Sequence, residues 1–114
     1  MAVSISERDG VLIVKPSGRL IGPAGGELRQ ALNEQLEQIS EAPKVLFDLS
    51  AATRMDSSAL GTLVATQVTV ARKGGRSAIV NISSGVRNLL IMGRLMSVFE
   101  HYENEDEAIA ELTS

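Results

Sequence analysis

The sequence predicts an α/β domain with a mixed sheet of about five strands and about four helices, because three observations agree. Short apolar runs alternate with longer segments whose apolar residues recur every three or four positions. Glycine and proline separate many of these segments. Strands that alternate with helices form parallel sheets through right-handed crossovers. An Asp9-Gly10 turn adds a hairpin, so we expect the N-terminal strand to be antiparallel and the rest mainly parallel.

The chain begins with two predicted strands. Residues 3–7 alternate apolar and polar side chains, as a half-exposed edge strand does. Residues 11–20 form the second strand, and Pro16 and Gly18 indicate that it ends, bends or lies at an edge there. The exposed edge of the first strand leaves room for a weak homodimer.

A helix and a buried strand follow. The helix runs from about residue 26 to residue 39, and Pro43 lies beyond its end. Its apolar residues recur at spacings of four, four and three: Leu28, Leu32, Leu36 and Ile39. The apolar run of residues 44–50, "KVLFDLS", is typical of a strand in the centre of a sheet.

A second helix begins at Asp56 or Ser57 and extends to about Lys73. Its end is well marked. Arg72 and Lys73 place cations at the negative end of the helix dipole, and Gly74 suits the left-handed conformation that closes a helix.

The last third of the chain repeats the alternation. We expect strands over residues 77–82 and 97–102, with a short helix from Ser83 or Ser84 to about Leu90 between them. Asn104 then caps a terminal helix with an acidic first turn. Because no composition shift interrupts the 114 residues, we expect a single domain over residues 1–114.

Composition excludes several function classes. The net charge is -3 and aromatic residues make up 3% of the chain, which argues against nucleic acid as a partner. The absence of cysteine excludes disulfides, thiol nucleophiles and cysteine-based zinc sites. No apolar run approaches the roughly 20 residues that span a bilayer, and the N-terminus has no signal-peptide pattern. We therefore expect a cytoplasmic protein with no membrane partner.

Catalytic motifs are missing. The single histidine, His101, lies at the end of a predicted strand, and no G-x-S-x-G or G-x-x-x-x-G-K-[ST] motif occurs. Asp48 and Asp56 have no third acidic neighbour in the sequence with which to hold Mg²⁺. The sequence therefore predicts neither an enzyme nor a metal or cofactor site.

The stretch "MDSSALG", residues 55–61, stands out at the start of the second helix. One polar residue is enough to cap a helix, and three lie together here. If Ser57 is the cap, Ser58 takes the first helical position and its hydroxyl faces solvent. A phosphate at that place would meet free N–H groups and the positive end of the helix dipole. The stretch is therefore either a plain cap or a hydroxyl placed for modification.

A family resemblance supports the second interpretation. The segment "KVLFDLSAATRMDSSALGTLVATQVTVARKGG" resembles the core of STAS domains, the sulfate-transporter and anti-sigma-factor-antagonist family. "VLIVKPSGRL" is similar to the second strand of that family, and "SSGVRNLLIMGRLMSVFEHYENEDEAIAEL" to its last third. The D-S-S-x-L-G element after a "DLS" strand is the most specific part of a resemblance that covers essentially the whole chain.

The resemblance implies a bacterial regulator of transcription that acts by partner switching. An antagonist of this type binds an anti-sigma factor that is also a serine kinase, and so frees the sigma factor. Phosphorylation of the second serine of the motif, Ser58 here, breaks the complex, and a phosphatase restores it. The residues expected to face the partner are Asp56, Ser57, Ser58, Ile21, Arg54, Ala59 and Thr62.

Three of these residues need separate comment, because two differ from the family pattern and one has several possible roles. Ile21 stands where antagonists often have an acidic residue, and Ala59 stands where glycine is common. Arg54 is placed to pair with Asp56 or with a phosphate on Ser58, or else to remain a solvated surface residue.

Two other functions remain open. STAS-like domains also serve as non-switching subunits, for example in ABC-type phospholipid transport complexes, and Ile21 in place of the acid leaves room for this. A small enzyme with Ser58 as nucleophile is the third alternative, although the sequence offers it neither a general base nor an oxyanion frame.

Overall fold

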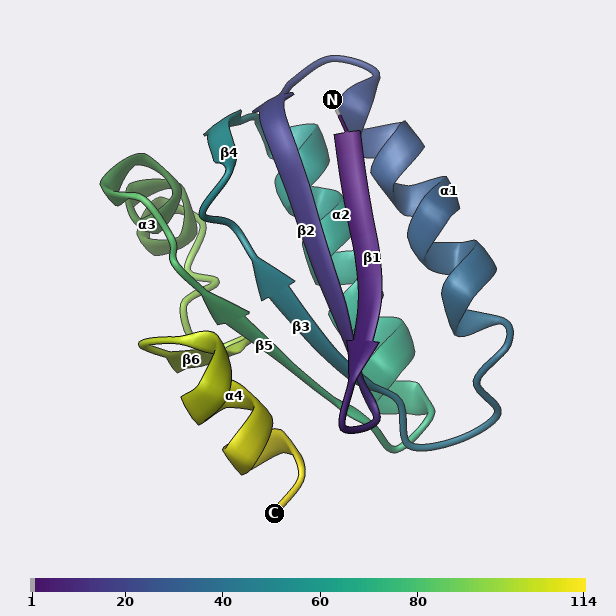
Figure 1. Ribbon diagram of the computed structural model, residues 1–114. Coiled ribbons are helices and arrows are strands. Elements are labelled where there is room, and N and C mark those ends of the chain that lie inside the picture. The colour runs from purple at the N-terminus through teal and green to yellow at the C-terminus, as the bar shows by residue number, and fades with distance from the viewer. Residues whose placement is uncertain (1) are drawn as a thin grey trace.

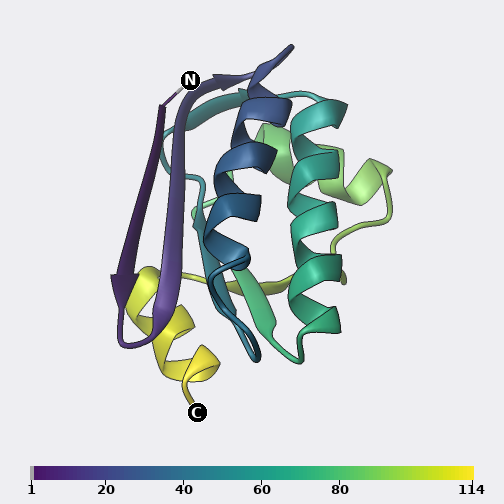
Figure 2. The same cartoon turned by 90° about the vertical axis from the view of Figure 1, so that its right-hand side faces the viewer.

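The computed structural model describes residues 2–114, which form one mixed sheet covered by helices on both faces (Figures 1 and 2). The elements in chain order are β1 (Ala2–Arg8), β2 (Val11–Leu20), α1 (Ala24–Leu36), β3 (Lys44–Asp48), β4 (Ala52–Met55), α2 (Ser57–Arg72), β5 (Arg76–Val80), α3 (Ser84–Met92), β6 (Glu100–Tyr102) and α4 (Glu105–Leu112). The predicted α/β class and its four helices are confirmed.

The sheet has six strands, one more than the predicted five. Its order is β1-β2-β3-β5-β6, and β4 pairs with β2. Only the β1–β2 pair is antiparallel, as predicted; the other pairs are parallel. The additional strand, β4, extends the line of β3 along β2, where β2 continues past Gly18 through a bulge. The predicted break in the second strand is therefore a bend that lets one long strand pair with two short ones.

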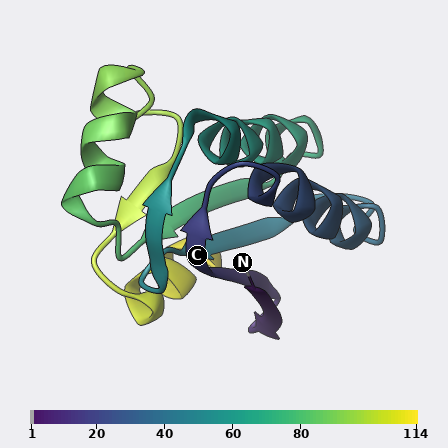
Figure 3. The same ribbon diagram turned by 90° about the horizontal axis from the view of Figure 1, so that it is seen from above.

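The buried side chains of the strands divide between the two faces of the sheet. Leu12, Val14 and Phe47 pack against the side covered by α1 and α2, while Val11, Ile13 and Leu46 pack against α4 on the other side. Figure 3 shows α1 and α2 together above the sheet and α4 below it. Because helices cover both faces, the central strands are apolar on both sides rather than alternating.

Several boundaries differ from the prediction, most clearly those of α1 and of the last strand. Helix α1 begins at Ala24 and ends at Leu36, whereas the spacing predicted about 26 to 39. Its C-terminal end is closed by the Lys73 ammonium, which donates to the carbonyls of Leu36 and Ile39 at 3.0 and 2.8 Å. The last strand is also shorter than predicted and covers only Glu100–Tyr102.

The fold brings the starts of α1 and α2 to the same end of the molecule (Figure 2). Both helices follow strands that point to this end, because β2 and β4 run parallel. Within residues 2–114, no helix is both long enough and apolar enough to cross a membrane.

Candidate functional site

Asp56 is the residue that caps α2. Its carboxylate accepts a hydrogen bond from the Ala59 amide at 3.0 Å, and its own amide donates to the Leu20 carbonyl at 3.0 Å. Ser57 and Ser58 therefore occupy the first and second positions of the helix. The sequence left the cap open between Asp56 and Ser57, and the arrangement with Ser57 as cap and Ser58 in the first position is wrong.

The same carboxylate also fixes the turn between β2 and α1. Its second oxygen accepts from the Gly22 amide at 2.8 Å. Gly22 has φ of 61°, in the left-handed region that favours glycine. These amide donors, first that of Ala59 and then that of Gly22, lower the pKa of Asp56 below its ordinary value, so the side chain is a carboxylate at neutral pH. A single ionised group thus holds the turn against the start of α2.

The hydroxyls of Ser57 and Ser58 lie on the surface at this end of the molecule. Both residues are exposed, and no hydrogen bond to another described residue engages either hydroxyl. Ser58 also lies beside α1, since a Cβ atom added to Gly25 would be only 2.7 Å from the Ser58 Oγ. The hydroxyl is accessible to solvent and bounded on one side by a second helix.

Thr62 and Ala59 support the site from inside. The Thr62 hydroxyl donates to the Gly25 carbonyl at 2.8 Å, in a residue that is 3% exposed. Ala59 is fully buried between the helices and the sheet. We expected both side chains to contact a partner directly. Both side chains are buried here, so neither lies on the exposed surface, and their part in partner binding stays a prediction.

Ile21 and Arg54 lie at the margin of the site. Ile21 is half-buried and immediately precedes the Gly22 turn, while Arg54 is exposed on β4. Arg54 lines a small cleft of about 150 Å³ between β4 and the start of α3. The ion pairs formed within residues 2–114 do not include one between Arg54 and Asp56, and the Asp56 oxygens accept from the Gly22 and Ala59 amides instead.

Gly25 is the functional residue that sequence reasoning missed. It is buried where α1 passes α2, and a Cβ atom there would lie 3.0 Å from the Ala59 nitrogen. The available signal was the pair of glycines at the start of a predicted helix, because glycine within a helix often marks a close approach of two backbones.

Acidic residues do not gather into a metal site in the part of the chain that the structure describes: no group of three or more His, Cys, Asp or Glu side chains there is placed to hold an ion. Asp48 instead accepts hydrogen bonds from the Ser50 amide at 3.0 Å and the Asn81 side-chain amide at 3.1 Å. Lys15 lies 3.9 Å from its other oxygen. These contacts give Asp48 a structural part at the end of β3.

Known proteins with similar sequences and structures identify the family of this domain. The family model for the STAS domain matches residues 2–108. A STAS-domain anti-sigma-factor antagonist protein from Planctomyces limnophilus is 18% identical over 98% of both chains, with a TM-score of 0.87. The anti-sigma factor antagonist SpoIIAA, solved in unphosphorylated and phosphorylated forms, is 19% identical in the former over 98% of this chain and 96% of that chain, with a TM-score of 0.83.

The same fold also occurs inside a much longer protein. The murine anion transporter Slc26a9 is 18% identical over 95% of this chain, with a TM-score of 0.80, and the match covers 18% of the transporter. At these identities the solved structures show the shared fold.

Proposed function

The chain belongs to the STAS domain family, and we propose that it is an anti-sigma-factor antagonist whose binding is switched by phosphorylation of Ser58. In this proposal the unphosphorylated protein binds an anti-sigma factor that is also a serine kinase. The kinase transfers the γ-phosphoryl group of ATP to the Ser58 hydroxyl, which loses its proton, and ADP leaves. The complex then dissociates, and a phosphatase hydrolyses the phosphoserine to restore the binding form. The protein acts in the bacterial cytoplasm and catalyses no reaction itself.

The observation that carries the proposal is the position of the Ser58 hydroxyl. It is exposed at the second position of α2, a place that the Asp56 cap and the Thr62–Gly25 hydrogen bond hold fixed. A kinase needs a hydroxyl that it can reach from solvent and that stays in one place while bound. Ser58 meets both conditions without any movement of the core.

The charge of a phosphate accounts for the switch. Phosphorylation adds about 1.5 to 2 negative charges, and Ser58 lies two residues from the ionised Asp56. If the partner surface opposite Ser58 is apolar or acidic, binding would remove the water around the phosphate without providing a positive charge in its place. Since each 1.4 kcal/mol changes an affinity tenfold, a penalty of a few kcal/mol separates the complex.

The neighbouring residues contribute to the proposed interface in two ways, as exposed contacts or as buried support. Ser57, Ile21 and Arg54 are the exposed or half-exposed contacts around Ser58, and Asp56 contributes fixed negative charge. Ala59 and Thr62 act through packing, because both are buried. The interface would therefore be formed mainly by the β2–α1 turn, the end of β4 and the first turn of α2.

The test is a phosphorylation assay with ATP and a serine-kinase anti-sigma factor from the source bacterium, followed by mass spectrometry of the peptides. We expect one phosphate, located on Ser58, in the wild type and in the matched control Ser57→Ala. Ser58→Ala should receive none. A phosphate on Ser57, or full phosphorylation of Ser58→Ala, would refute the assignment of the site.

A second function is favoured by one residue. Ile21 replaces the acid that antagonists often carry, and the anion transporter Slc26a9 shows that this fold also occurs outside antagonists. In this alternative the protein is a non-switching subunit of an ABC-type phospholipid transport complex, bound to its ATPase. Purification from native cells under mild conditions separates the two functions, since a transporter ATPase would co-purify in one case and a kinase-like anti-sigma factor in the other.

The absence of catalysis in the proposal is supported by the position of the single histidine. The His101 Nε2 atom bonds to the Met96 carbonyl at 2.7 Å, and the ring lines a cleft between α3, β6 and α4. Ser58 is not among the residues of that cleft. A screen with ester and amide substrates should therefore show no turnover that depends on Ser58.

A further inference from the structure

A second hollow lies at the carboxyl ends of β5 and β6, between α3 and α4. Its volume is about 370 Å³, within the range of small-molecule sites. In open α/β sheets, ligands bind in the crevice beyond the carboxyl ends of the strands. None of the residues discussed as the proposed partner interface lines this cleft. It is therefore a separate candidate for binding.

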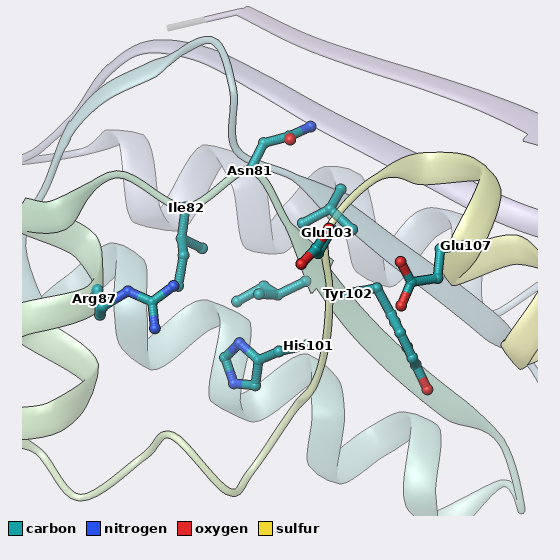
Figure 4. Close-up of a pocket in the computed structure, with 9 residues that line it drawn as sticks. Asn81, Ile82, Arg87, His101, Tyr102, Glu103 and Glu107 are labelled. Atoms are coloured by element: carbon teal, nitrogen blue, oxygen red, sulfur yellow. The ribbon is translucent and has the colours of Figure 1, made fainter.

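Positive and negative side chains lie on opposite sides of the cleft. Arg87 projects from α3 on one side, and Glu103 and Glu107 come from the end of β6 and the start of α4 on the other (Figure 4). All three are exposed, and none of them takes part in the ion pairs formed within residues 2–114. One cation and two carboxylates thus face the cleft without partners from the described chain.

The remaining lining residues are either apolar or already hydrogen-bonded to other residues of the protein. Ile82 is the half-buried apolar side chain of the lining, whereas Ile79 and Val80 are each 1% exposed and belong to the core. The Asn81 side chain is bound to Asp48 at 3.1 Å, so its amide is engaged away from the cleft. Because a carbonyl only accepts, the His101 Nε2 atom must carry the proton that it donates to Met96, and a neutral ring keeps Nδ1 as an acceptor.

From this arrangement we propose that the cleft binds a basic amino acid. The ligand carboxylate lies against Arg87, and its two cationic groups lie against Glu103 and Glu107. The aliphatic chain lies over Ile82, the half-buried apolar side chain of the lining. A simple anion would face two carboxylates, and a simple cation would face Arg87, so a molecule with one carboxylate and two cations matches the site best. The proposal does not depend on the antagonist function.

L-lysine and two of its analogues provide the test. Norleucine has the shape of lysine without the side-chain ammonium, and cadaverine is lysine without the carboxylate. NMR titration of the ¹⁵N-labelled full chain with each compound should give saturable shifts at Ile82, Arg87 and Glu103 for lysine. Norleucine and cadaverine should bind at least tenfold more weakly.

Variants then assign the charges. Arg87→Gln should remove the preference for lysine over cadaverine, and Glu107→Gln should reduce the preference over norleucine. Arg72→Gln is the matched control, because Arg72 is exposed near the end of α2 and does not line the cleft. Absence of saturable lysine binding overturns the proposal, as does equal binding of cadaverine or an unchanged preference in Arg87→Gln. Amide spectra of each variant confirm that it is folded.

Discussion

Substitution of Gly25 by alanine should disturb the helix contact that positions Ser58. A Cβ atom at this residue would lie 2.7 Å from the Ser58 Oγ and 3.0 Å from the Ala59 nitrogen. The hydroxyl can rotate away, but the backbone nitrogen cannot. The second distance is about 0.4 Å short of the 3.4 Å at which ordinary contacts begin, so the starts of α1 and α2 must move apart by about that amount.

The cost follows from the crowding of a packed interior. Overpacking of this kind destabilises proteins by about 1 to 3 kcal/mol, and the better helix propensity of alanine returns at most about 1 kcal/mol. With the full return, we therefore expect Gly25→Ala to lower the free energy of unfolding by up to about 2 kcal/mol. At roughly 4 °C per kcal/mol for a chain of this size, Tm falls by up to about 8 °C.

Gly26→Ala is the matched control. It is the next residue of the same helix, and a Cβ atom there meets no other atom within 4 Å. Its Tm should stay the same or rise slightly, because alanine restricts the unfolded chain. Thermal unfolding by circular dichroism gives the stability of both variants, and the kinase assay gives the rate of Ser58 phosphorylation, which should fall only in Gly25→Ala. Equal stability and equal phosphorylation rates in the two variants would refute the close approach of the helices at Ser58.

Three further predictions concern single contacts. Thr62→Val removes the hydrogen bond to the Gly25 carbonyl and should cost about 1 kcal/mol in urea denaturation; an unchanged midpoint would show that this bond contributes nothing. The hydrogen bond that the Tyr102 hydroxyl donates to Glu100, with a smaller contribution from burial, raises the pKa of Tyr102 to about 12. Because Tyr102 is the only tyrosine, its ultraviolet titration should show a midpoint near 12, which Glu100→Gln should lower, and a wild-type midpoint near the ordinary value would contradict the contact. Since the folded pKa is raised, the stability that the Tyr102 contact provides is present below the ordinary tyrosine pKa and is lost as pH rises through 12, which unfolding at alkaline pH would detect.

The elements with strong apolar periodicity were predictable from sequence. Helix α2 was expected to end at about Lys73 and ends at Arg72, because cations and glycine mark its end locally. Strand β4 was missed. Its four residues include two exposed ones, and it exists because β2 extends beyond β3 and offers a free edge. That partner lies far away in the sequence, so no local pattern reports it.

The site shows the same limit. The sequence contains three adjacent residues able to cap α2. Asp56 is favoured over Ser57 because the Gly22 amide, 34 positions earlier, donates a second hydrogen bond to the Asp56 carboxylate. The family resemblance implied that Thr62 faces the partner. Its burial results from the way α1 crosses α2 at Gly25, which depends on packing rather than on the sequence of either helix.

The most direct test of the switch is the affinity of the anti-sigma factor for this protein with and without a phosphate on Ser58. Isothermal titration calorimetry should give an affinity at least tenfold weaker for the phosphorylated form, while Arg72→Gln, at the other end of α2 from the proposed interface, binds like the wild type. Equal affinities of the phosphorylated and unphosphorylated forms would contradict the account.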